Sequence, residues 1–263
     1  MYAACKVEGV LAWPAYCAAQ LENVDSLDAS EWPAFRAIGQ AARLEDMTVM
    51  VDASTTITRA RSRAAGLFLD SGYDVWLTFD DDNFATVDVL RDLVRVVRAT
   101  GGMCSAPYAN RDRHSMTFER VRGPTAHIEG SPVWDVNRIG LGMTAIHRNL
   151  VRGLAKTAPT WKDPKTFRAK DPEVLCELPA LFLEGVVDGL WTGEDYSFCD
   201  RVAAEGLPNH VLLDAPSFHA GVWSKLDLEG RILVQGAEVA ADLHEATEAT
   251  VSPTVHGDTH AAV

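Results

Sequence analysis

The sequence predicts an α/β fold, with a mostly parallel central sheet flanked by helices in a single domain. Three observations support this prediction: short apolar runs alternate with amphipathic helical patterns, each helical pattern ends at glycine, and a cluster of acids directly follows one apolar run. The expected strands cover 7–13, 47–53, 74–79 and 103–107, and the expected helices cover 56–70 and 86–100.

The first two strands are short apolar runs, VEGVLAW at 7–13 and MTVMVDA at 47–53, each followed by polar residues. Runs of this kind are typical of strands in a parallel sheet. The run at 74–79 is rich in β-branched and aromatic residues, which favour a strand. Strands that alternate with helices indicate right-handed crossovers, which place the carboxyl end of each parallel strand at one edge of the sheet.

Both expected helices show apolar residues at helical spacing. In the first helix these are Ile57, Ala60, Ala64, Leu67 and Phe68, and Gly72 follows as a stop. In the second they are Val87, Leu90, Val94 and Val97, followed by Gly101 and Gly102.

The pattern is less regular beyond Gly102. A further strand is expected at 139–146, a loop-rich stretch at 108–138, and a surface excursion at 157–180, which is rich in Pro, Lys and Asp. A helix is expected from about Tyr196 to Glu205, ended by Gly206 and Pro208. The main domain thus covers 1–236, with halves at 1–100 and 101–236, and 237–263 forms a helical or flexible tail.

Composition and charge disfavour several classes of protein. The chain has 263 residues and a net charge of −13, which disfavours sequence-independent attraction to nucleic acid. No apolar stretch approaches the ~20 residues that span a bilayer, and the N-terminus shows no signal segment, so a soluble, cytoplasmic protein without an integral membrane segment is expected. The five cysteines are widely spaced without a CxxC pair, which indicates buried or free thiols.

Three adjacent carboxylates, Asp80, Asp81 and Asp82, follow the strand at 74–79. Such a cluster is costly unless a cation compensates it, and hard divalent ions prefer oxygen ligands. The alternative is a solvated acidic turn in which Asp82 caps the next helix. The position at a strand end favours the metal-binding interpretation.

Two later motifs carry further candidates. Glu194 and Asp195 precede the helix near 196, where they act as helix-capping or first-turn acids, as a base that takes a proton from an attacking hydroxyl, or as both. The positive end of the helix is expected to lower the pKa of this carboxylate. His219 follows an expected strand and is either a structural residue or a metal ligand that suits manganese.

These motifs, in this order, resemble a family. TITRARSRAAGLFLDSGYDVWLTFDDD, IGLGMTAIHR, GEDYSFCDR and FHAG together resemble a nucleotide-sugar-dependent glycosyltransferase of the GT-A fold, similar to glycosyltransferase family 2, over roughly residues 7–225. The resemblance implies a Rossmann-like sheet and a DxD motif with Asp80 and Asp82 as its outer acids. It also implies a Mn²⁺ or Mg²⁺ ion held by Asp80, Asp82 and His219, and Asp195, with neighbouring Glu194, as the base of an inverting reaction.

The resemblance also implies donor and acceptor contacts. Trp191 is expected to stack on the acceptor, or else to be a core residue. The expected donor-binding residues are Pro14, Tyr16, Asp52, Arg59, Arg61, Asp80, Asp81, Gly140 and Gly142. For Asp52 the alternative is a strand-terminating turn acid, for the arginines a solvated helix face, and for the glycines a bulge or turn. The chain has Ser62 where the family often has Asn.

The expected function is therefore metal-dependent transfer of a hexose from a nucleoside diphosphate sugar, with uridine diphosphate as the expected nucleotide, to a hydroxyl acceptor. The alternatives are a nucleotidyltransferase and a non-catalytic nucleotide- or carbohydrate-binding module. The acceptor is a glycan or, with basic clusters at 110–114 and 119–123 as its support, a hydroxymethylated base in DNA.

Overall fold

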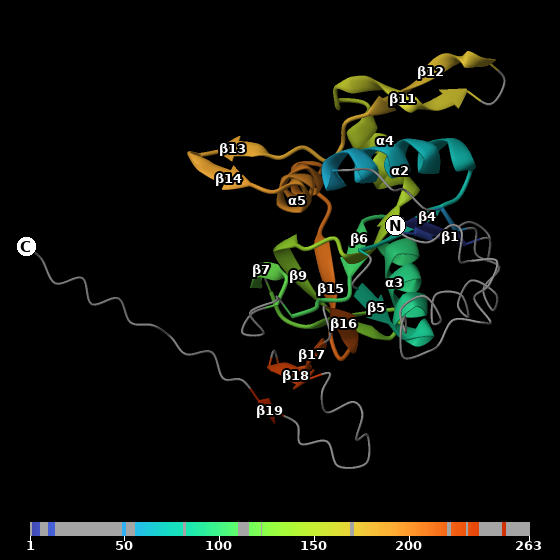
Figure 1. Ribbon diagram of the computed structural model, residues 1–263. Coiled ribbons are helices and arrows are strands. Elements are labelled where there is room, and N and C mark those ends of the chain that lie inside the picture. The colour runs from blue at the N-terminus through green and yellow to red at the C-terminus, as the bar shows by residue number, and fades with distance from the viewer. Residues whose placement is uncertain are drawn as a thin grey trace, which may run out of the picture.

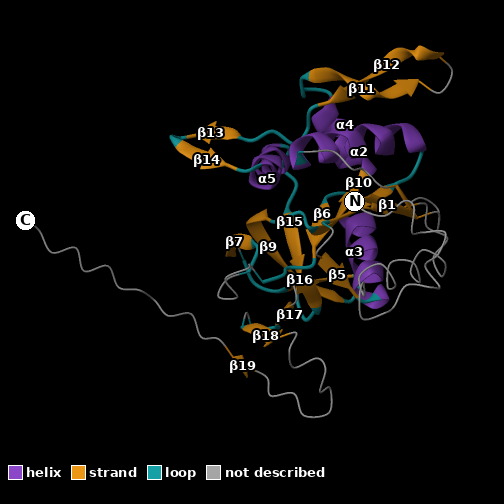
Figure 2. Ribbon diagram, viewed as in Figure 1, coloured by secondary structure: helices purple, strands orange, loops and turns teal. Residues whose placement is uncertain are grey.

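The chain folds into a mixed α/β domain (Figures 1 and 2). The computed structural model describes residues 2–5, 10–13, 49–50, 56–80, 83–109, 116–121, 123–168, 171–219, 222–229, 231–236 and 249–250. Figure 1 shows α2 (Ile57–Ser71), α4 (Arg148–Ala155) and α5 (Glu194–Ala204) grouped above the central strands, whereas α3 (Val87–Thr100) lies lower, beside them. The predicted α/β class is thus confirmed, whereas most of the tail at 237–263 lies outside the described residues.

The central sheet has the strand order β3-β1-β2-β4-β10-β6-β15-β9-β7, with β8 paired to β9. Its strands are β1 (Tyr2–Cys5), β2 (Val10–Trp13), β3 (Val49–Met50), β4 (Val75–Phe79), β6 (Met103–Ser105), β7 (Phe118–Val121), β8 (Ala126–Ile128), β9 (Ser131–Ile139), β10 (Met143–His147) and β15 (Asn209–Leu212). Among these described strands only the β2–β4 and β6–β15 pairs are parallel. The prediction of a mostly parallel sheet is therefore wrong: the sheet is mixed, because β10 inserts antiparallel between β4 and β6.

Three helices begin and end close to their predicted bounds: α2 (Ile57–Ser71), α3 (Val87–Thr100) and α5 (Glu194–Ala204). The helix α4 (Arg148–Ala155) was not predicted. Gly72 and Gly101 end α2 and α3 with φ of 87° and 70°, a conformation that glycine adopts without steric cost. The N-cap of α3 is Thr86, whose side chain accepts from the Val89 N–H, so the alternative that Asp82 caps this helix is wrong.

The stretch at 108–138 is not loop-rich, as predicted, but contains β7, β8 and most of β9. The strand predicted at 139–146 is divided: β9 ends at Ile139, β10 begins at Met143, and residues 140–142 connect them. This connection lies beside the carboxyl end of β4, because the Asp80 N–H donates to the Gly142 carbonyl at 2.8 Å. The division therefore brings the two predicted glycines to the acidic cluster.

A second sheet begins directly after the acidic cluster. Its order is β19-β18-β17-β16-β5, and all of its pairs are antiparallel. Its strands are β5 (Asn83–Ala85), β16 (Ser217–His219), β17 (Val222–Leu226), β18 (Ile232–Gly236) and β19 (Ala249–Thr250). Because β5 pairs with β16, His219 stands directly opposite Asn83 in the register.

The predicted surface excursion at 157–180 is a hairpin of β11 (Thr160–Arg168) and β12 (Asp171–Pro179). Asp163 in this hairpin is fully buried and pairs with Arg59 at 2.8 Å and Arg63 at 2.5 Å, both from α2. Leu178 packs so closely on Gly66 that a Cβ there would lie 2.6 Å from it. The hairpin is thus fixed to α2 at its base and extends from it, as Figure 1 shows.

The apolar core lies between the sheet and the helices. Trp76 on β4 contacts Phe68 of α2 and the edge of Phe182, and Phe182 stacks on Phe198 of α5 with 4.5 Å between ring centroids. Among the described cysteines, Cys104, Cys176 and Cys199 are free thiols. No helix within the described ranges is long and apolar enough to cross a membrane.

Arg148 closes the carboxyl end of α2. Its guanidinium donates to the carbonyls of Leu69 and Phe68, each at 2.7 Å, and of Tyr73, and lies over the Phe68 ring.

Arg148→Ala should lower the free energy of unfolding by about 3 kcal/mol, because buried carbonyls at the helix end lose their donor. Urea denaturation measures this change. Arg98→Ala, which removes a partly exposed ion pair with Asp74, should cost less than about 1 kcal/mol, and equal losses would contradict this role.

Candidate functional site

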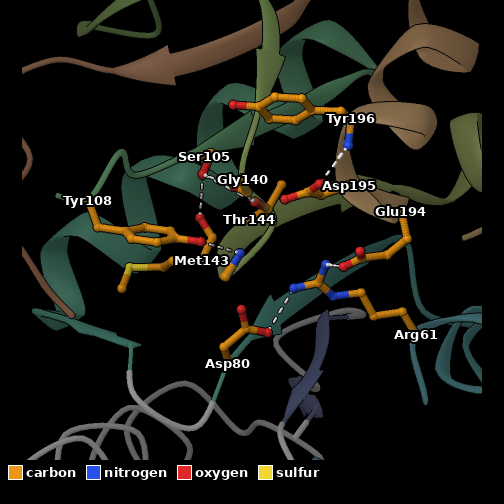
Figure 3. A network of polar contacts seen from close by, with 11 residues as sticks. Arg61, Asp80, Ser105, Tyr108, Gly140, Met143, Thr144, Glu194, Asp195 and Tyr196 are labelled. Carbon is orange, nitrogen blue, oxygen red and sulfur yellow. Dashed lines mark hydrogen bonds and ion pairs between the residues drawn. The ribbon is translucent and has the colours of Figure 1, made fainter. Parts of the chain in front are cut away.

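The site is built around Arg61, which joins two carboxylates from distant parts of the chain. Its guanidinium donates to Asp80 at 2.8 Å and to Glu194 at 2.5 Å, and Figure 3 shows it reaching both. Asp80 directly follows β4, and Glu194 is the first residue of α5. Two of the sequence motifs, the acidic cluster and the Glu-Asp pair, are thereby brought together.

Burial makes this network strong. The Arg61 side chain is 3% exposed, and those of Asp80 and Glu194 are 27% and 14% exposed. A guanidinium that is removed from water needs compensating carboxylates, and two such carboxylates need the cation in return. Removal of Arg61 would therefore leave two carboxylates close together in a poorly solvated environment.

Asp195 lies in the first turn of α5, whose N-cap is Gly193. One of its oxygens accepts from the Tyr196 N–H at 2.8 Å. Burial raises the pKa of Asp195, and Glu194 and Asp80 raise it further, whereas Arg61 and the Tyr196 N–H lower it. The predicted lowering of the pKa by the helix terminus is thus wrong: loss of hydration has the larger effect. A raised pKa makes Asp195 a better proton acceptor.

His219 lies on β16 of the second sheet, opposite Asn83, which follows the acidic cluster. Its Nδ1 is 2.8 Å from the Ala109 carbonyl, and its ring lies against Tyr108 with 4.8 Å between centroids. Donation from Nδ1 to the carbonyl places the lone pair of the neutral ring on Nε2. A carbonyl partner of this kind is what typically orients a metal-binding histidine.

Tyr108 is a site residue that the sequence analysis missed. Its hydroxyl accepts from the Gly142 N–H at 3.1 Å, and burial, with Asp80 as a further cause, raises the pKa of the phenol. A Cβ on Gly142 would lie 2.4 Å from this hydroxyl, and one on Gly140 would lie 2.9 Å from it. The two glycines are therefore required for close packing around Tyr108. Their Gly-x-Gly spacing is the sequence feature that could have indicated this packing.

A pocket of about 600 Å³ opens beside these residues. Its lining includes Asp195, His219 and Tyr108, with Gly140 and Trp191 at its wall. Trp191 is not a core residue: it is 69% exposed on a short hairpin, so the core alternative is wrong. The pocket thus has a carboxylate with a raised pKa, an imidazole and an aromatic surface within one space.

Other predicted site residues lie elsewhere or outside the description. Arg59 is directed to Asp163 and lies over the Trp161 ring, on the opposite side of α2 from Arg61. Pro14, Tyr16, Asp52, Asp81 and Asp82 lie outside the described residues. Within the described ranges no three His, Cys, Asp or Glu side chains form a metal-binding group, and Asp80 and His219 are the predicted ligands that fall in those ranges.

Comparison with known proteins gives little. No family model matches the chain, and no curated protein matches it. Among solved structures it is similar to that reported as the crystal structure of A197 from STIV, with 15% sequence identity and a TM-score of 0.42 over 73% of this chain and 83% of that chain. A similarity this weak supports no inference about function.

Gly142→Ala should destabilise the protein by about 2–3 kcal/mol, because the new methyl group would lie 2.4 Å from the Tyr108 hydroxyl and 2.6 Å from the Asn83 amide. Gly153→Ala on α4 is the matched control. Its Cβ would meet nothing closer than Glu205 at 3.9 Å, and it should stabilise by about 0.5 kcal/mol. Chemical denaturation of both variants tests the packing, and equal effects would contradict it.

Arg61→Ala should raise the pKa of Asp195, because Arg61 is the cation that lowers it. The carboxyl carbon of Asp195, assigned by its absence in Asp195→Asn, should titrate at higher pH by NMR. Arg61→Lys keeps the charge and should shift the titration less. Arg59→Ala, which removes a cation facing Asp163, should leave it unchanged. Identical curves for the two alanine variants would show that Arg61 does not set this pKa.

Proposed function

We propose that the protein is a metal-dependent glycosyltransferase that moves a sugar from a nucleoside diphosphate sugar, with uridine diphosphate favoured, to a hydroxyl acceptor. The observation that carries this proposal is the Arg61 bridge between Asp80 and Glu194. It brings Asp80, the candidate for binding the nucleotide-sugar donor, next to the Glu-Asp pair, the candidate for activating the acceptor hydroxyl. Donor and acceptor would then both bind near the carboxyl end of β4.

Asp195 is the proposed general base. It lines the pocket, and its raised pKa favours acceptance of a proton from an acceptor hydroxyl as that hydroxyl attacks the anomeric carbon. The bond from the anomeric carbon to the diphosphate oxygen breaks as the new bond forms on the opposite face. Such a single displacement inverts the anomeric configuration.

The side chains proposed as metal ligands are of types that bind a divalent cation. Asp80 offers a carboxylate at the strand end, and the hydrogen bond of His219 to the Ala109 carbonyl directs its second nitrogen as a ligand. Asp82 is the third proposed ligand, from the sequence resemblance. A bound Mn²⁺ or Mg²⁺ would supply positive charge for the diphosphate leaving group.

Arg61 has a positioning role in this proposal. It holds Glu194, and with it the first turn of α5, at a fixed place relative to Asp80. Tyr108 and Gly140 line the pocket, and Gly142 packs directly against the Tyr108 hydroxyl.

Asp195→Asn should lower transfer from uridine diphosphate sugars, assayed with manganese, by ~100-fold or more while donor affinity stays near wild type. The amide keeps the size of the side chain and removes the proton acceptor. The product of the wild type should have inverted configuration by the NMR coupling of its anomeric proton. Retained configuration, or a variant with near-normal turnover, would exclude Asp195 as the base.

The same variant has an independent stability readout. Because the pKa of Asp195 is raised in the folded state, its ionisation lowers stability as pH rises through that pKa. Asp195→Asn should therefore be more stable than wild type at neutral pH, and the difference should vanish below the ordinary aspartate pKa of 3.8. A loss of stability at neutral pH would indicate a structural role instead.

A further inference from the structure

A short hairpin projects beside the pocket. It consists of β13 (Gly185–Val187) and β14 (Leu190–Thr192), which form a two-stranded sheet of their own. Its turn residues, Asp188 and Gly189, have φ of 51° and 80°, the left-handed pair that matches the twist of two-residue hairpins. Figure 1 shows it extending away from the body next to α5.

The hairpin exposes large apolar side chains. Val186 is 67% exposed, Leu190 72% and Trp191 69%, and Val187 is 43% exposed. An isolated two-stranded hairpin is only marginally stable in water. Four neighbouring exposed apolar side chains on such a hairpin indicate a binding surface for a ligand or partner.

One face of this hairpin is continuous with the pocket. Val186 and Trp191 are direct partners in the register, so their side chains share a face. Trp191 also lines the pocket together with Asp195. A ligand that presents a hydroxyl near Asp195 therefore meets this apolar face with its adjoining part.

Charge restricts the chemistry of that ligand. The segment 183–195, LEGVVDGLWTGED, contains Glu184, Asp188, Glu194 and Asp195 and no Lys or Arg. Glu194 is paired with Arg61, whereas Glu184 and Asp188 on the hairpin itself have no Lys or Arg beside them in this segment. These two acids disfavour a polyanion such as DNA or an anionic lipid surface. The surface thus favours a neutral, apolar group.

We infer that the hairpin β13–β14 is an acceptor subsite for neutral acceptors that carry an aliphatic or aromatic group next to the reactive hydroxyl. The assignment of the bound molecule as a sugar acceptor rests on the proposed function. The apolar subsite itself is defined by the hairpin and the pocket. The apolar group lies on Val186 and Trp191, and the hydroxyl lies toward Asp195.

Paired octyl and methyl glycosides of glucose, galactose and mannose, titrated below micelle formation by calorimetry, test this subsite. At least one octyl glycoside should bind about 10-fold or more tightly than its methyl partner, because its chain covers the exposed indole. Trp191→Ala should abolish the preference, and Trp191→Phe should restore part of it. Leu228→Ala, which truncates a 53% exposed leucine outside the hairpin, should leave it unchanged. No preference in any pair overturns the inference.

The binding assay separates the two proposals. An octyl preference that depends on Trp191, without sugar transfer from any donor, would support the subsite and overturn the transferase. Transfer to acceptors with no octyl preference would do the reverse. Trp191-dependent sedimentation with phosphatidylcholine vesicles, or Trp191-dependent dimers in ultracentrifugation, in the absence of a glycoside preference would assign the hairpin to a lipid surface or a second copy and overturn the inference.

Discussion

The buried ion pairs of Arg61 are the interaction on which the candidate site depends. Without the guanidinium, Asp80 and Glu194 would be two poorly hydrated carboxylates with mutual repulsion, and the end of β4 would separate from the start of α5. With it, residues more than one hundred positions apart share one cation. The same cation also limits the rise in the pKa of Asp195. One side chain, Arg61, therefore influences both the placement of α5 beside β4 and the pKa of Asp195.

The sequence predicted α2, α3 and α5 more accurately than the strands between residues 108 and 147, and it did not predict α4. The ends of α2 and α3 depend on local chemistry, since Gly72 and Gly101 adopt positive φ, and the predicted bounds differ from the observed ones by at most one residue. The strand β9 was missed because its buried residues, Ser131, Val133, Val136 and Ile139, neither form a continuous apolar run nor alternate strictly, and polar residues lie between them. Such a strand resembles a loop when long apolar runs are sought. The antiparallel placement of β10 depends on tertiary pairing, which no local pattern contains.

The candidate site was predicted in part. The motifs that contain Asp80, Glu194 and His219 do meet near the carboxyl end of β4, as their positions at element ends suggested. Tyr108 was missed because its role arises from contact with Gly142, across a connection whose shape depends on the fold. The direction of the Asp195 pKa was predicted wrongly because burial cannot be read from the neighbouring sequence, whereas a helix terminus can.

The alternation of arginines on α2 has a consequence for sequence change. Successive helical residues are rotated by about 100°, so Arg61 is directed to Asp80 and Glu194 while Arg59 and Arg63 are directed to Asp163. Deletion or insertion of one residue between Arg59 and Arg63 would turn one set of cations away from its acids. Three buried or partly buried carboxylates would then compete for too few partners. This segment should therefore accept substitutions on its surface but no change in length.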